Sequence, residues 1–126
     1  MLKYLTSLAT ACGDTTKTLI DTITLPAGTR SIIGVWVHAM AGPGFTTLEN
    51  VTGFLELESP DINLQPCQVP LEPVGMLTGG AVSSQIHTWP LNASVKGSER
   101  ISGYITMDMA QTVANKARFG LVVDVA

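Results

Sequence analysis

Residues Ser31 to Met40 read SIIGVWVHAM, and they stand between the turn-forming segments TLPAGTR and AGPG. Large apolar side chains occur at both odd and even positions of this stretch, whereas a strand with one face in water should alternate apolar and polar residues. The flanking proline and glycine residues favour a strand over a helix. The stretch therefore predicts a strand that is apolar on both faces, and its second face needs a cover.

Length and composition predict one domain spanning 1–126 that is large enough to bury its own core. Charged residues make up 13% of the chain and the net charge is −3, well below the usual charged fraction of ~25%. A surface so poor in charge favours self-association. The seven basic residues are scattered along the chain, so direct binding of nucleic acid is not expected. No apolar run approaches the ~20 residues that a membrane span needs.

Short apolar segments separated by turn signals predict an all-β, antiparallel two-sheet sandwich with less than about 15% helix. Strands are expected near 17–25, 31–40, 51–58, 82–89, 101–109 and 117–125. The expected core includes the alternating apolar residues Leu55, Leu57, Ile101, Ile105, Leu121 and Val123. Residues 2–9 fit either a strand or a helix. The proline-rich segment 59–80 predicts a long loop with one short edge strand near 64–69.

No group of residues has the spacing of an active site or a metal site. His38 and His87 each lie on an apolar strand, where a lone histidine is usually a packing or interface residue. Glu56 and Glu58 are two residues apart on an exposed strand face, which is typical of solubilising charge. Cys12 and the other cysteine, Cys67, lack zinc-binding spacing and are expected to be free thiols. The sequence thus predicts no enzyme, no catalytic or metal-binding residues and no cofactor.

Four segments carry a resemblance to a known family: TITLPAGTRSIIGVWVHAM, VTGFLELESPD, ISGYITMDM and the terminal FGLVVDVA. In the order, length and residue pattern of its predicted strands, the chain resembles the small single-jelly-roll capsid proteins of tailless icosahedral viruses of bacteria and archaea. The resemblance implies a Greek-key sandwich of eight strands, a place in the virion, and partners that include the chain itself and other capsid proteins. A basic nucleic-acid-binding arm, which many small RNA-virus coats have, is absent here.

A second class of function stays open, a β-sandwich binding module that recognises a glycan or another protein. For a self-associating subunit, the outward side of segment 31–40 is the candidate contact surface. If Ile33, Val35 and Val37 point inward, the outward residues are those at the intervening positions. This predicts a subunit interface of Ile32, Trp36, His38 and Met40. The cover is expected to be either the proline-rich loop or a neighbouring subunit, and the low surface charge favours the neighbour.

Overall fold

The computed structural model describes the whole chain except residues 13–14, 41–51, 65–66, 74–83, 86 and 109–114. The described residues form eleven β-strands and no helix, so the predicted all-β class is confirmed. The strands are β1 Leu2–Thr6, β2 Thr10–Cys12, β3 Thr18–Thr24, β4 Thr29–Met40, β5 Gly53–Glu58, β6 Gln68–Pro70, β7 Glu72–Pro73, β8 Ser84–Gln85, β9 Trp89–Ser94, β10 Arg100–Met107 and β11 Asn115–Val125.

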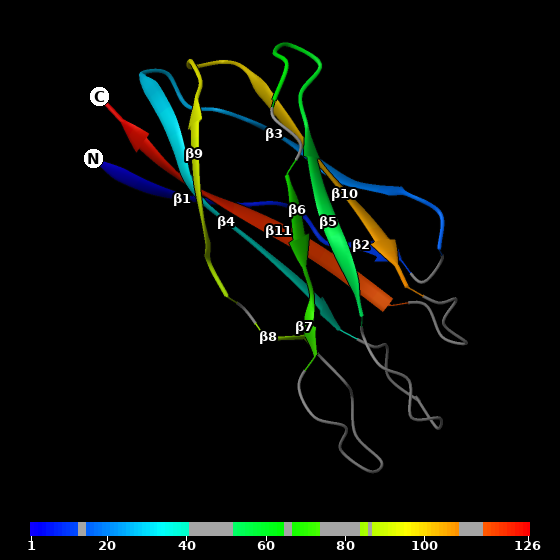
Figure 1. Ribbon diagram of the computed structural model, residues 1–126. Coiled ribbons are helices and arrows are strands. Elements are labelled where there is room, and N and C mark those ends of the chain that lie inside the picture. Colours follow the sequence, from blue (N-terminus) through cyan, green and yellow to red (C-terminus); the bar gives the residue numbers. More distant parts are fainter. Residues whose placement is uncertain (13–14, 41–51, 65–66, 74–83, 86, 109–114) are drawn as a thin grey trace.

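Two antiparallel sheets pack face to face (Figure 1). The five-stranded sheet has the order β1-β11-β4-β9, and β2 pairs with β11 on the same side as β1. The four-stranded sheet has the order β3-β10-β5-β6, and β7 pairs with β8 in a separate small ladder. Stacked sheets of this kind bury their facing side chains and leave the two outer faces to other contacts.

The strand pairing is nested around the middle of the chain. β1 pairs with β11, β3 with β10, β4 with β9, and β5 with β6. Successive pairs alternate between the two sheets, which is the arrangement of a single jelly roll. The predicted jelly roll is therefore confirmed, and the pairing of β1 with β11 brings the two chain ends side by side (Figure 1).

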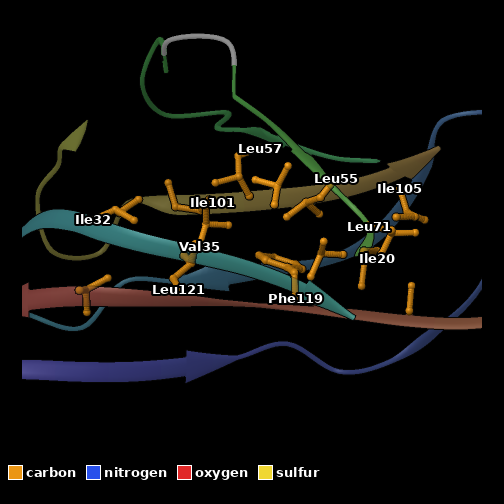
Figure 2. Packing of buried hydrophobic residues seen from close by; sticks show 14 of the residues in the cluster. Ile20, Ile32, Val35, Leu55, Leu57, Leu71, Ile101, Ile105, Phe119 and Leu121 are labelled. Atoms are coloured by element: carbon orange, nitrogen blue, oxygen red, sulfur yellow. The ribbon is translucent and has the colours of Figure 1, made fainter. Parts of the chain in front are cut away.

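The core fills the space between the sheets (Figure 2). Phe119 and its neighbours on β11 and β4 face the apolar residues of β5 and β10. All six predicted core residues are buried, with relative exposures of 4% or less: Leu55, Leu57, Ile101, Ile105, Leu121 and Val123. The alternating pattern on β5, β10 and β11 thus gave the correct inward faces.

The pattern on β4 is interrupted near Ile32. Ile32 is fully buried, while Ile33 is 37% exposed. The register of β4 shifts between Ile32 and Gly34 against β9, and the β11 register shifts at the same level, as at a β-bulge. An extra residue on one strand moves every later side chain to the opposite face. The expectation that Ile33 points inward and Ile32 outward is therefore wrong, whereas Val35 and Val37 point inward as predicted.

Three strands refine the expected strand positions. The strand expected at 82–89 is replaced by the short β8 and by β9, which begins at Trp89 and runs through Pro90. β9 is an edge strand, where the missing N–H of a proline is tolerated. Residues 2–9, which fit strand or helix, contain the strand β1. The edge strand expected near 64–69 is β6, displaced towards the C-terminus.

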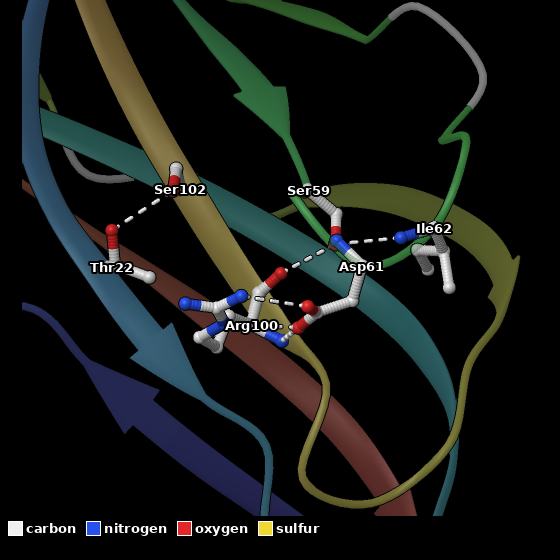
Figure 3. A network of polar contacts seen from close by, with 6 residues as sticks. All are labelled: Thr22, Ser59, Asp61, Ile62, Arg100 and Ser102. Atoms are coloured by element: carbon white, nitrogen blue, oxygen red, sulfur yellow. Dashed lines mark hydrogen bonds and ion pairs between the residues drawn. The ribbon is translucent and has the colours of Figure 1, made fainter.

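The chain after β5 is fixed to the start of β10 by polar contacts (Figure 3). The Asp61 carboxylate accepts hydrogen bonds from the Arg100 guanidinium at 2.8 and 3.2 Å and from the Arg100 main-chain N–H at 2.8 Å. The Ser59 hydroxyl donates to the Arg100 carbonyl at 2.6 Å. The Arg100 guanidinium holds the pKa of the exposed Asp61 carboxyl below its ordinary value. These contacts position the first part of the 59–67 segment beside the open edge of the sandwich.

The register shift predicts unequal effects for two neighbouring isoleucines. Replacing buried Ile32 with alanine should lower the free energy of unfolding by about 2–5 kcal/mol, because a cavity is left in the core. Replacing Ile33 with alanine should cost less than about 1 kcal/mol, because its side chain is partly exposed. Urea denaturation of both variants measures the difference. Equal costs would contradict the register described for β4.

Candidate functional site

The predicted interface residues all lie on β4, but they do not all face outward. Trp36 and His38 are half-buried on the outer face, defined here as the side of the five-stranded sheet turned away from the core. Ile32 belongs to the core, so its predicted place on the surface is wrong. Ile33 is the partly exposed neighbour instead. The side chain of Met40 falls outside the described part of the structure.

Trp36 lies across the neighbouring strand rather than pointing into solvent. It pairs directly with Gly120 of β11. A Cβ atom placed on Gly120 would lie 2.2 Å from both Cε2 and Nε1 of the indole. Only glycine leaves room for the ring at this position, and an aromatic residue over a glycine is a known way to shield an exposed sheet backbone. The Arg118 guanidinium lies over the same indole, 5.7 Å from the ring centroid.

Beside Trp36, the outer face is covered by the side chains of Val122 and Thr88. Val122 is only 5% exposed although it is not part of the core cluster, and it pairs with Gly34 and Tyr4. Cγ2 of Thr88 would lie 2.8 Å from a Cβ atom on Gly34, so this threonine packs directly on the glycine. The second face of β4 is thus covered in part by Trp36 of the strand itself and by Thr88.

Positive charge gathers at one end of the outer face. A hollow of about 300 Å³ is lined by Ala9, His38, Lys116, Ala117 and Arg118. Burial lowers the pKa of the His38 imidazole below its ordinary value, and the positive charge of Arg118 lowers it further. His38 is therefore neutral at pH 7, so the positive charge of the hollow comes from Lys116 and Arg118.

The most exposed apolar side chains of the outer face lie on β1. Tyr4 is 73% exposed and Leu2 is 52% exposed. Their partners on β11, Val122 and Asp124, point to the outer face, and directly paired residues share a face. The sequence pattern did not identify these two residues, because Leu2, Leu5 and Leu8 also fit a helix. The alternation of Leu2, Tyr4 and Thr6 was the available signal.

A second hollow lies at the open edge between the two sheets. It measures about 240 Å³, and its apolar lining comes from β5, the segment after it and β9: Leu57, Ile62, Leu64, Cys67, Leu91 and Ala93. Cys67 is a free thiol, and burial raises its pKa. The thiol is therefore protonated at neutral pH, which makes it a weak nucleophile.

No family model matches this chain, and no curated protein matches its sequence. Within the described residues, no three histidine, cysteine, aspartate or glutamate side chains are grouped so that they could hold a metal ion. The same residues include no helix that is long and apolar enough to cross a membrane. The outer face of the five-stranded sheet is the candidate site, because it carries exposed Leu2 and Tyr4 and half-buried Trp36.

Replacing Gly120 with alanine tests the packing of Trp36. The added methyl group should displace the indole and lower the free energy of unfolding by about 1–3 kcal/mol. In a Trp36→Ala background the same change should lower the free energy of unfolding by about 0.5 kcal/mol or less, because the added methyl group no longer clashes with an indole ring. Denaturation of the four proteins in this double-mutant cycle measures the coupling. Equal costs in both backgrounds would show that the ring does not lie over Gly120.

Replacing His38 with glutamine tests its environment. Because the pKa of His38 is lowered in the folded state, the unfolded chain takes up the proton first as the pH falls through about 6.5. The wild-type protein should therefore lose stability between about pH 7.5 and pH 5.5, and His38→Gln should lose less. Melting temperatures at the two pH values measure this, with His87→Gln, at an exposed position, as control. Identical pH dependence in all three proteins would contradict the prediction.

Proposed function

We propose that this chain is a structural subunit of a virus particle, a jelly-roll capsid protein that self-associates into a shell. The observation that carries the proposal is the strand order, because the nested pairing of the eight main strands is that of a single jelly roll. Jelly rolls recur in viral capsid proteins, although they also occur in lectins and other proteins. The resemblance of the four sequence segments to small capsid proteins points the same way.

Surface composition favours self-association. Charged residues are 13% of the chain. Four of the six large apolar side chains exposed in the described structure belong to the first eight residues: Met1, Leu2, Tyr4 and Leu8. Ile33 and half-buried Trp36 extend this apolar surface onto β4. Exposed aromatic and aliphatic groups of this kind commonly mark protein interfaces.

The alternative proposal is a module that binds a glycan or another protein. The hollow of about 240 Å³ between the segment after β5 and β9 is the feature that favours it, because small ligands occupy apolar clefts. The outer face is less suited to sugar stacking, because Arg118 already lies over the Trp36 ring. A glycan would have to displace this guanidinium to stack on the indole.

Measuring the mass of the purified protein over a range of concentrations separates the two proposals. A capsid subunit should form oligomers that grow into a particle, which electron microscopy can detect. A binding module should stay monomeric at every concentration, and that result would overturn the capsid proposal.

Trp36→Ala tests the outer face as the assembly surface. The variant should fold, because Trp36 is only half-buried, but it should assemble at least about ten-fold more weakly, since truncated aromatic anchors commonly cost ~2 kcal/mol or more. Leu19→Ala is the matched control, because Leu19 is 46% exposed on the opposite sheet. Sedimentation measures assembly, and circular dichroism checks folding. Equal assembly of both variants would exclude the outer face as the interface.

A further inference from the structure

The outer edge of β1 carries a row of main-chain hydrogen-bonding groups that pair with no described strand. Met1 and Val125 exchange two main-chain hydrogen bonds of 2.8 Å, and the Ser7 N–H donates to the Phe119 carbonyl at 2.8 Å. Along an antiparallel strand, the main-chain N–H and C=O groups of successive residues point alternately towards and away from the neighbouring strand. Because Met1 and Ser7 bond to β11, the main-chain groups of Lys3 and Leu5 face β11 as well. The N–H and C=O groups of Leu2, Tyr4 and Thr6 therefore point away from the sheet. No described strand pairs with β1 on that side.

Among the described strands, three other edge strands of the two main sheets, β3, β6 and β9, are protected against pairing. β6 contains Pro70, and because the N–H of Leu71 faces β5, the position of the missing proline N–H faces outward. β9 contains Pro90. On β3, the outward N–H of Thr22 is bonded to the Asp21 carboxylate at 2.8 Å. Prolines and local caps of this kind prevent sheets from joining edge to edge.

β1 has none of these devices along its outward row. Tyr4, at the centre of the row, is 73% exposed, and Leu2 is 52% exposed. An exposed apolar edge strand with free main-chain groups recruits another strand. Lys3 is the only charged residue of β1, and its main chain faces β11.

We propose that β1 pairs in an antiparallel manner with β1 of a second copy of the chain, about a two-fold axis through Tyr4. Tyr4 then lies opposite Tyr4 of the second copy, and Leu2 lies opposite Thr6. The three outward residues form about six main-chain hydrogen bonds across the axis. Lys3 lies opposite Leu5, so this register places no like charges directly opposite each other.

A second copy suits this edge because the outward N–H and C=O groups of Leu2, Tyr4 and Thr6 can bond to the same groups of an identical antiparallel strand. A two-fold contact uses the same residues twice, and the central Tyr4 pair needs no other sequence. The outer faces of the two five-stranded sheets then become continuous, with Leu2 and Tyr4 at their junction. This inference deepens the proposed function, because it names one contact between subunits, and it rests on that proposal only for the identity of the partner as another copy.

A charge exchange at Tyr4 tests the pairing and its register. Tyr4→Lys and Tyr4→Glu each place like charges directly opposite at the axis, so each variant alone should dimerise at least about ten-fold more weakly than the wild type. An equimolar mixture of the two should recover the dimer, with an affinity that falls as salt is added. Sedimentation of the separate and mixed proteins measures this. A mixture no tighter than the separate variants would overturn the proposed register.

Tyr4→Pro tests the main-chain bonds themselves. The change removes an N–H that faces away from β11, so the fold should survive while the dimer weakens about ten-fold or more. Tyr4→Thr, which keeps the N–H and a strand-favouring side chain, should dimerise more tightly than Tyr4→Pro. Equal dimerisation of these two variants, with folding verified by circular dichroism, would overturn edge pairing.

The same measurements separate this inference from the capsid proposal. Dimers that depend on Tyr4 and never grow into larger particles would support edge pairing and overturn the capsid proposal. Particles that form equally well from Tyr4→Pro would support the capsid proposal and overturn edge pairing.

Discussion

The ladder between β4 and β11 is the pairing on which the rest of the structure depends. It lies in the middle of the five-stranded sheet, with β1 on one side and β9 on the other. Its register shifts decide that Ile32 faces the core and that Trp36 faces outward over Gly120. Because side chains alternate along a strand, β4 without this shift would turn Trp36 into the core and Val35 outward if Ile32 stayed buried.

The sequence was a good guide to the regular parts of the fold. Residues 53–58 and 101–107 alternate cleanly, and their inward residues, such as Leu55 and Ile105, are the buried ones. The same reasoning failed on β4, because both candidate faces were apolar and a local pattern cannot locate a register shift. It also failed at β9, because a proline normally argues against a strand, yet β9 begins at Trp89 and runs through Pro90 at the sheet edge.

The candidate surface was predictable in part. Trp36 and His38 were correctly placed on the outer side of β4, but the cover of Trp36 depends on Gly120, which is far away in the sequence. Such a contact appears only when the strand pairing is known. Tyr4 was not identified because its exposure follows from the position of β1 at a sheet edge, and position within a sheet is not a local property of the sequence.

The two proposed contacts have different consequences for assembly. A two-fold contact between β1 edges is closed once two copies have joined, so it cannot extend a shell by itself. Growth needs a second contact on a different surface, and the apolar part of the outer face around Trp36 is available for it. Since edge pairing joins two outer faces into one surface, each dimer would present the Trp36 region twice. A shell built in this way would use the β1-paired dimer as its repeating unit.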